Sequence, residues 1–243
     1  MIFSKLYSID ISTASREIGD YRSIGEFFVR DLKPGMRPID SGFVSPVDGT
    51  LRSSGSVFER KCFIVKDVSY DVAELVLDPS VEDYLINGRW FNFYLSPQDY
   101  HHVHSPIDGE IVSCTFIPGT LLPVNDFSLK RVPHLFTLNE RVVVAVKTQK
   151  GLVVVVLVGA LNVGRIEMAF SEFFEKNQDL NVSCRQVVRR ELSSPLPIRA
   201  GDRLGTFYMG SSVIVIAQEG VLQEGESLSS TRVVYGMRLA PLA

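Results

Sequence analysis

The chain has 243 residues, of which 45% are hydrophobic and 22% charged, as expected of an ordinary globular protein that buries a sizeable core. Its formal net charge of −3 at pH 7 argues against a nucleic-acid partner, which would favour a basic excess. The cysteines, Cys62, Cys114 and Cys184, are odd in number and widely spaced, so neither a disulfide framework nor a Cys-x-x-Cys metal site is predicted and a reducing compartment is favoured.

The sequence contains no segment typical of a membrane-spanning helix or a signal peptide. No stretch reaches the roughly 18 apolar residues that a spanning helix requires. The longest apolar run, Leu152 to Ala160, is rich in β-branched residues and predicts a buried strand. The first residues, Met1 to Tyr7, lack the long apolar segment and small-residue cleavage site of a signal peptide. We therefore expect any contact with a membrane to be peripheral.

The first predicted elements are helical. Residues 1–20 show no clear apolar period and are expected to form a loop or a short surface helix. Ser23 and Glu26 form a capping box ahead of an apolar run, which predicts a helix over about residues 24–32. Pro34-Gly35 follows and prevents its continuation.

A second helix and three strands are predicted further along the chain. Asp71 is a candidate N-cap, which predicts a helix over about residues 72–78. Residues 90–95 alternate between apolar and polar, which predicts a half-buried strand. Two apolar runs, 142–148 and 152–158, are joined by three residues ending in glycine, which predicts a hairpin.

Two further features admit either a structural or a membrane interpretation. Arg185, Arg189 and Arg190 follow the hairpin in a segment expected to be helix or loop. Such a basic cluster is most often a solvated face, and the alternative is attraction to anionic lipid. Phe27 and Phe28 are expected to pack in the core beneath the first helix rather than to enter a membrane.

One short motif occurs twice. Ser45-Pro46-Val47-Asp48-Gly49 recurs 60 residues later as Ser105-Pro106-Ile107-Asp108-Gly109. The repetition predicts two similar turns, in which proline fixes the entry and Asp-Gly leads into a strand. Asp48 and Asp108 are both expected to be turn residues on this basis, and nothing local distinguishes them. Short strands between Gly-rich turns predict an α+β, β-rich fold, a compact antiparallel sandwich or barrel with a few flanking helices.

The pair Gly210-Ser211 precedes a strand-like run from Val213 to Ala217. Glycine tolerates backbone conformations closed to other residues, and a serine after it at a corner can turn its Oγ onto the Gly210 carbonyl. That geometry suits an N→O acyl shift, in which the chain cuts itself at this bond. The alternative is an ordinary Gly-Ser turn leading into a core strand, because this pair is common in turns.

Histidines cluster between His101 and His104. On an extended segment, His102 and His104 share one face and His101 lies on the other. A metal site would need further ligands, for which Asp99 or Asp108 is available, but no other metal signature is present. The remaining interpretations are a cluster without function and acid–base chemistry, since histidine titrates near neutrality.

Seven motifs, taken in order, resemble those of the phosphatidylserine decarboxylases, pyruvoyl enzymes that make phosphatidylethanolamine. The resemblance runs from about Tyr21 to the C-terminus. Met209 and Ser212 replace the outer residues of the usual Leu-Gly-Ser-Thr, and Pro123 stands where the family usually has serine. The motifs are Phe27-Phe28-Val29-Arg30, Arg37-Pro38-Ile39-Asp40, Phe43 to Gly49, Asp99 to Pro106, Asn139-Glu140-Arg141, Leu157 to Ala160 and Met209 to Ser212.

The resemblance implies self-processing and a role for each of four residues. It assigns Asp48 as the carboxylate and His104 as the base of an Asp-His-Ser arrangement with Ser211. In such an arrangement the carboxylate orients the imidazole, which takes the serine proton. The acyl group attacked is the Gly210 carbonyl, and the resulting ester eliminates to dehydroalanine, which hydrolyses to a pyruvoyl group and ammonia.

The resemblance also implies the mature enzyme. The single catalytic domain, residues 1–243, would become a heterodimer of a β chain, 1–210, and an α chain, 211–243, with a homo-oligomer of these left open. The pyruvoyl group would form a Schiff base with phosphatidylserine and act as the electron sink for loss of CO2. His101 would protonate the resulting carbanion. Because Pro123 replaces a hydroxyl-bearing residue, it puts in doubt only a secondary contribution to substrate binding or protonation.

The implied fold is a β-rich core akin to lipoyl-type barrel-sandwich domains. The implied location, for a bacterial source, is peripheral, at the cytoplasmic face of the cell membrane. Two alternatives remain: a pyruvoyl-dependent decarboxylase of another amine-bearing carboxylate, and a non-catalytic β-rich interaction domain whose motifs are structural turns.

Overall fold

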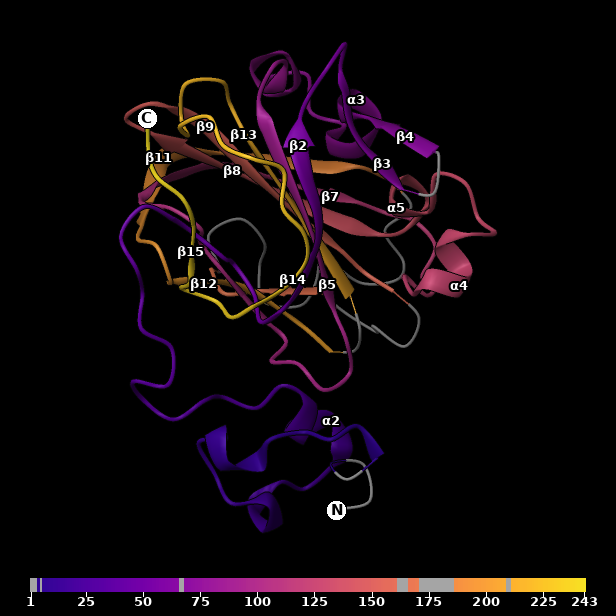
Figure 1. Ribbon diagram of the computed structural model, residues 1–243, viewed down its shortest axis with the longest axis vertical. Helices are drawn as coiled ribbons and strands as arrows, with labels where there is room; N and C mark the ends of the chain where they lie inside the picture. The colour runs from indigo at the N-terminus through magenta and orange to yellow at the C-terminus, as the bar shows by residue number, and fades with distance from the viewer. Residues whose placement is uncertain (1–3, 5, 66–67, 161–165, 171–185, 209–210) are drawn as a thin grey trace.

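The structure is a computed structural model that describes residues 4, 6–65, 68–160, 166–170, 186–208 and 211–243 (Figure 1). Its central element is an antiparallel sheet with the strand order β11-β7-β8-β9-β13-β5-β2-β14. The described strands form an open sheet, so the predicted β-rich, sandwich-like fold is confirmed without closure into a barrel. In that order the strands are Val188–Ile198, Gly109–Ile117, Arg141–Thr148, Gly151–Val158, Ser211–Ala217, Arg89–Leu95, Gly49–Ser56 and Ser229–Val233.

Small sheets and short helices surround this sheet. No helix in the described part of the chain is long and apolar enough to cross a membrane. The short strands pair as β10 (Ile166–Met168) with β12 (Arg203–Phe207) and β6 (His102–His104), β1 (Phe43–Val44) with β15 (Arg238–Ala240), and β3 (Lys61–Val65) with β4 (Val68–Asp71). The helices are α2 (Ile24–Phe28), α3 (Val72–Val76), α4 (Asp126–Leu129) and α5 (Leu135–Leu138), with 3-10 turns at Ile11–Thr13, Ile18–Asp20 and Glu82–Leu85.

Both predicted helices form and both are shorter than predicted. The side chain of Ser23 accepts a first-turn amide at the start of α2, and that of Asp71 does the same for α3. α3 ends because Leu77 adopts the left-handed conformation, with φ of 44°. Phe27 and Phe28 are fully buried, which confirms their place in the core.

The strand β5 is buried more completely than its alternating pattern predicts. Phe91, Phe93 and Leu95 are fully buried on one face, as expected. Trp90 and Asn92, on the other face, are also only 8% and 1% exposed. The prediction of a half-buried strand is therefore wrong, because β5 lies between β13 and β2 inside the sheet and both of its faces are covered.

The hairpin prediction is confirmed, whereas the segment after it differs from expectation. β8 and β9 pair along their whole length, ending with Thr148 opposite Gly151. Arg189 and Arg190 lie on the edge strand β11 and not in a helix or loop, and Arg185 is outside the described residues. Arg189 is held by Asp78, with 2.8 Å between its Nε and the carboxylate, so it serves a local ion pair.

The two Ser-Pro-x-Asp-Gly turns lie side by side and repeat each other's contacts. The amide of Val44 donates to the carbonyl of Pro106 at 2.9 Å. At the equivalent place in the second turn, the amide of His104 donates to the carbonyl of Pro46 at 2.8 Å. The predicted similarity of the turns is confirmed, and their mutual pairing fixes the backbone of His104 beside the first turn.

Each turn is also closed by a glycine from a distant part of the chain. Gly236 donates its amide to the carbonyl of Ser45, and Gly201 donates to that of Ser105, both at 2.9 Å. Both glycines have φ of +86°, a conformation that other residues rarely adopt. The repetition therefore extends to the two strands β15 and β12, which follow these glycines.

Candidate active site

Ser211 is the first residue of β13, in the middle of the large sheet. It lies opposite Leu95 of β5, and the next residue, Ser212, lies opposite Val158 of β9. Both serines are fully buried, and neither Oγ has a hydrogen-bond partner among the residues that the structure describes. Gly210 is outside the described residues. The Ser211 hydroxyl is thus not committed to any structural hydrogen bond.

The histidines alternate across the strand as predicted. The rings of His102 and His104 lie on the same side as that of Tyr100, with centroids 4.8 and 5.7 Å from it. The ring of His101 lies instead against Phe28, at 3.9 Å. All three imidazoles are at most 5% exposed. The two candidate functional histidines therefore occupy different environments.

His104 is held as a neutral imidazole of defined tautomer. Its Nδ1–H donates to the carbonyl of Gly201 at 2.7 Å, which leaves Nε2 as the acceptor facing the Tyr100 hydroxyl at 3.3 Å. The ring stacks on Tyr235 with centroids 3.9 Å apart and planes within 4°. Burial lowers the pKa of His104 to about 4, and the charge of Arg203 lowers it further, against an opposing effect of the Gly201 hydrogen bond. A neutral imidazole is the form that can accept a proton.

Asp48 is a buried carboxylate that a guanidinium and a backbone amide hold in place. Arg37 donates from Nε to both carboxylate oxygens, each at 3.1 Å, and from Nη2 at 2.5 Å. The amide of Tyr235 donates to Asp48 at 2.9 Å. Among the described residues, Asp48 and His104 make no direct hydrogen bond. They are linked through Tyr235, whose backbone Asp48 binds and on whose ring His104 stacks.

The structure distinguishes Asp48 from Asp108, which the sequence alone does not. Asp108 makes the same kind of contact, accepting the amide of Ala200 at 2.7 Å, but it is exposed. Ala200 directly precedes Gly201, just as Tyr235 directly precedes Gly236. The second turn therefore has an alanine where the first has an aromatic ring. The residue that corresponds to His104 in the repeated contacts is Val44. Only the Asp48 turn is therefore accompanied by an imidazole and a stacked tyrosine.

His101 is the most deeply buried of the histidines. Its Nδ1–H donates to the carbonyl of Asp99 at 2.9 Å, and its Nε2 has no hydrogen-bond partner within the protein. Burial lowers its pKa to about 3. Arg30 donates to the same Asp99 carbonyl at 3.3 Å, so α2 and the segment after it fix the loop that carries His101. The imidazole is neutral, with an unpaired lone pair on Nε2.

Asp48, just before β2, and Ser211, in β13, lie on either side of β5, at the end of the sheet where β13 begins. Tyr94 of β5 lies opposite both Thr50 of β2 and Ser212 of β13. β5 lies between β2 and β13, and Asp48 comes just before β2. The backbone of Asp48 is therefore about two strand spacings, roughly 10 Å, from the start of β13. The sheet thus places the carboxylate and the serine at the same end.

The two candidate histidines differ in their distance along the chain from Ser211. The amide of Phe207, four residues before Ser211, donates to the carbonyl of His101 at 2.9 Å. His104 lies opposite Arg203, eight residues before Ser211. The β12 residue that contacts His101 is therefore fewer residues from the serine than the one opposite His104, and among the described residues neither histidine bonds the serine hydroxyl.

Sequence reasoning missed the partners that hold these groups. Arg37 and Arg30 stand in two of the resembling motifs but received no role, and Tyr100 directly precedes the histidine cluster. Tyr235 carries no local signal at all, because it is 187 residues away from the carboxylate that its amide bonds. The only available hint was the following Gly236, which marks a special turn.

The fold and these residues define a class of site. An uncommitted serine begins a central strand, neutral imidazoles lie on the segment that pairs with β12, the strand before it in the chain, and a carboxylate is fixed at the same end of the sheet as the serine. A hydroxyl, a neutral base and a carboxylate are the groups used in acyl transfer. The residue that could carry a covalently formed cofactor is Ser211.

The chain belongs to the phosphatidylserine decarboxylase family, whose sequence profile matches residues 24–240. A phosphatidylserine decarboxylase proenzyme of Myxococcus xanthus is 37% identical over 235 residues, which cover 96% of this chain and 82% of that protein. The proenzyme of Acinetobacter baylyi is 34% identical over 242 residues, or 98% of this chain and 82% of that protein. That of Anaeromyxobacter sp. is 36% identical over 221 residues, or 90% and 77%. The resemblance carried by the motifs is thereby confirmed.

Proposed function

We propose that this chain is a proenzyme that cuts itself between Gly210 and Ser211 and then decarboxylates phosphatidylserine to phosphatidylethanolamine. The observation that carries the proposal is Ser211, buried at the head of β13 with an uncommitted Oγ, in a chain whose residues 24–240 match the family. Cleavage divides the single domain into a β chain, 1–210, and an α chain, 211–243, which remain together because β13 lies between β9 and β5 of the β chain.

Self-cleavage begins with the Ser211 hydroxyl. Its Oγ attacks the Gly210 carbonyl through a five-membered ring, and the peptide bond becomes an ester while the amine of residue 211 is released. His104 accepts the hydroxyl proton at Nε2, since its Nδ1 already carries the proton donated to Gly201. Asp48 favours the protonated imidazole by its charge and holds Tyr235 beneath the ring.

Ser211 fits the source of the pyruvoyl group because no other group in the described part of the chain binds its hydroxyl. When present, this group supplies the electron sink for decarboxylation. His101 handles the protons: its free Nε2 takes one from the ammonium of the lipid and returns a proton to the carbon that has lost CO2. The Asp99 carbonyl, by accepting Nδ1–H, keeps Nε2 as the atom that does so.

The partners follow from the substrate. Phosphatidylserine resides in membranes, so the protein contacts a membrane surface peripherally, and in a bacterial cell it works at the cytoplasmic face of the cell membrane. No nucleic acid takes part. The cluster around Arg189 is a weaker candidate for lipid contact than its charge suggests, because Asp78 binds that guanidinium.

Intact-mass measurement tests the first half of the proposal. We expect a fragment of 33 residues, since 243 − 210 = 33, with a blocked N-terminus and a ketone that reacts with hydrazines. Ser211→Ala should never be cut. Ser212→Ala is the matched control and should be cut, because Ser212 cannot reach the Gly210 carbonyl through a five-membered ring. A chain that stays intact after long incubation, without a hydrazine adduct, would contradict the proposal.

Product analysis tests the second half. Cleaved protein incubated with phosphatidylserine should release CO2 and phosphatidylethanolamine, resolved by thin-layer chromatography. Cleavage and hydrazine reactivity without this product would show that the pyruvoyl group acts on a different amine-bearing carboxylate. Hence the two assays separate an error in the chemistry from an error in the substrate.

A further inference from the structure

A short segment around α4 covers the end of the sheet at which Ser211 lies. Asn139 anchors it, accepting the amide of Leu122 at 2.9 Å and donating to the carbonyl of Gly159 at 2.8 Å. Gly159 directly follows Val158, which is paired with Ser212. In Figure 1, α4 projects from the side of the sheet near this end. The segment is therefore an outer surface close to the reactive strand.

This surface combines an exposed aromatic ring with cations. Phe127 on α4 is 64% exposed, although the guanidinium of Arg131 lies 3.7 Å from its ring centre. Lys130 and Arg131 are both exposed. The one acidic side chain of α4, Asp126, is paired with Arg52 at 3.2 Å. The local charge is thus positive, and the exposed ring of Phe127 lies beside basic side chains.

We propose that α4 docks on the surface of an anionic phospholipid bilayer, with Phe127 entering the interface and Lys130 and Arg131 facing lipid phosphates. This inference rests on the proposed function, because a lipid substrate must pass from the bilayer to Ser211. An aromatic ring flanked by cations has the composition of an interfacial anchor. Basic side chains near an anionic surface add an attraction that salt screens.

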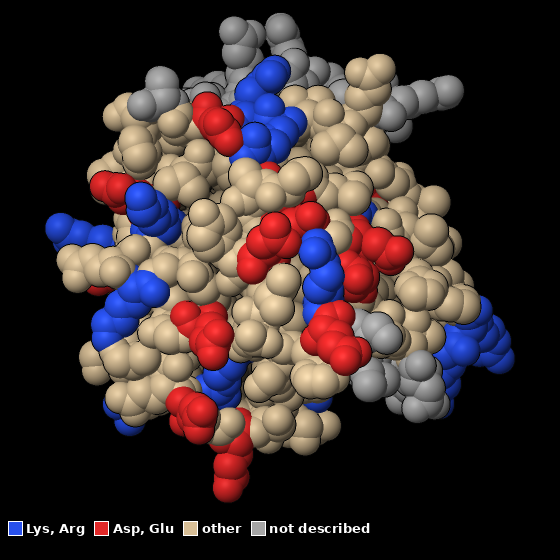
Figure 2. Space-filling model, turned by 90° about the horizontal axis from the view of Figure 1, so that it is seen from above, with Lys and Arg blue, Asp and Glu red and all other residues tan. Residues whose placement is uncertain are grey.

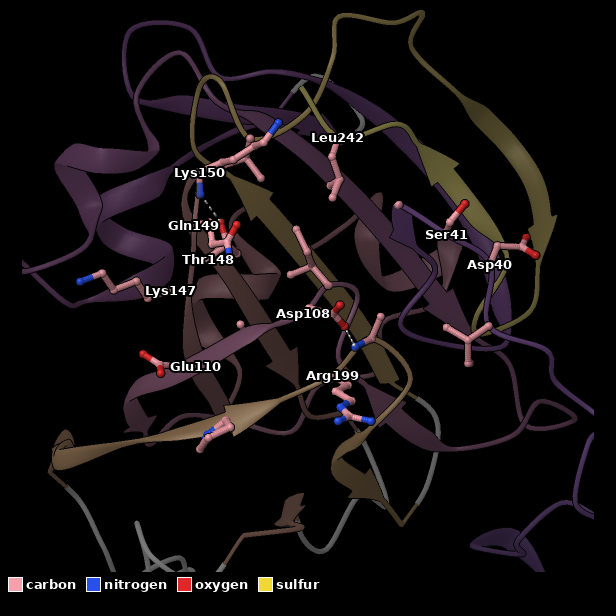
Figure 3. Close-up of a pocket in the computed structure, with 17 residues that line it drawn as sticks. Asp40, Ser41, Asp108, Glu110, Lys147, Thr148, Gln149, Lys150, Arg199 and Leu242 are labelled. Atoms are coloured by element: carbon pink, nitrogen blue, oxygen red, sulfur yellow. Dashed lines mark hydrogen bonds between the residues drawn. The ribbon is translucent and has the colours of Figure 1, made fainter.

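The face at the top of the view in Figure 1 is less suited to this contact. Figure 2 shows the molecule from above, and acidic side chains gather near the middle of that face. An anionic bilayer would repel such a surface. The pocket drawn in Figure 3, about 830 Å³ in volume, is not favoured either, since Asp40, Asp108 and Glu110 line it together with Lys147, Lys150 and Arg199.

The chain offers a matched control residue. Phe58 is 70% exposed, slightly more than Phe127. Phe58 comes two residues after Ser56, the last residue of β2. Ser56 lies opposite Arg89 of β5, and Arg89 lies opposite Ala217, the last residue of β13. At about 3.3 Å per residue, that end is roughly 20 Å from Ser211. A general effect of removing an exposed phenylalanine would appear equally in both variants.

The test is sedimentation of the cleaved protein with vesicles of phosphatidylcholine, with and without phosphatidylglycerol, an anionic lipid that lacks the amine required of a substrate. We expect Phe127→Ser to weaken binding to the anionic vesicles about tenfold, the loss that corresponds to one aromatic side chain no longer buried. Phe127→Trp should retain binding, and Phe58→Ser should bind as the parent does. Lys130→Gln and Arg131→Gln should each weaken binding several-fold at low salt and less at high salt.

Parallel assays keep this inference separate from the proposed function. Each variant is first checked for self-cleavage and for decarboxylation of a short-chain, monomeric phosphatidylserine, and both should be unchanged in Phe127→Ser. If the parent protein neither cleaves nor decarboxylates, the proposed function fails irrespective of the vesicle result. Equal binding by Phe127→Ser and the parent, or an equal loss in Phe58→Ser, overturns the docking proposal. A change of oligomeric state in Phe127→Ser without a change in vesicle binding also overturns it and assigns the surface to contact between copies.

Discussion

The buried histidines should make the folded protein sensitive to mild acid. Burial is the main cause that lowers the pKa of His101 to about 3 and those of His102 and His104 to about 4. In the unfolded chain each imidazole titrates near its ordinary pKa of about 6.5. Each imidazole therefore binds its proton more tightly when the chain is unfolded. Stability is fully present above about pH 6.5 and is lost as the pH falls toward about 4.

The expected loss is large relative to the stability of a domain. Between about pH 7.5 and 5.5, each of these histidines should lower the free energy of unfolding by a little more than about 1 kcal/mol, so the three together should lower it by roughly 4 kcal/mol. A typical domain has about 5–15 kcal/mol in total.

Urea unfolding at the two pH values measures the effect. The Ser211→Ala variant provides an uncut chain and thus a single unfolding reaction. On this background, His102→Asn should reduce the loss between pH 7.5 and 5.5 by roughly 1 kcal/mol, whatever it does to stability at either pH alone. If His102→Asn lost as much stability on acidification as its parent, the assignment of a neutral, buried imidazole at this position would be refuted.

Further predictions concern the proposed catalytic groups. Asp48→Asn should stop self-cleavage on a gel, whereas Asp108→Asn should be cut normally. Arg37→Gln leaves a buried carboxylate unpaired, so it should lower the free energy of unfolding by about 3 kcal/mol and slow cleavage, whereas Arg37→Lys should lose less. His104→Ala should accumulate uncut chain, because loss of a general base costs about 10² to 10⁴ in rate. His101→Ala should be cut yet form little phosphatidylethanolamine, and a failure of His101→Ala to be cut while His104→Ala is cut would reverse the two roles.

The features that the sequence predicts correctly are those fixed by local rules. Ser23 and Asp71 mark the starts of their helices because a side-chain oxygen binds an amide only two or three residues away. The environments of His101 and His104 separate because successive side chains of an extended segment point to opposite faces. These outcomes follow from the geometry of a few neighbouring residues, so the rest of the chain hardly influences them.

The features that the sequence could not predict depend on contacts across the chain. The tautomer of His104 is set by the carbonyl of Gly201, a partner 97 residues away. The buried second face of β5 depends on what covers the sheet, which alternation within the strand does not reveal. A polar residue such as Asn92 is 1% exposed there despite its sequence pattern. Propensity describes a strand in isolation, and the packing of the sheet decides how much of it meets water.

The repeated turn explains how a structural carboxylate could also serve the proposed catalytic site. Asp48 and Asp108 bind the amides of Tyr235 and Ala200 in the same way, so the first role of both carboxylates is to close a turn. The two carboxylates differ in their environment. Arg37 forms an ion pair with Asp48, and the imidazole of His104 stacks on the ring of Tyr235, whose amide Asp48 binds. Loss of Asp48 therefore combines a structural cost with a chemical one. Asp108 closes the matching turn without an imidazole beside it, so normal cleavage by Asp108→Asn together with no cleavage by Asp48→Asn would assign the effect at Asp48 to the groups around it rather than to the turn.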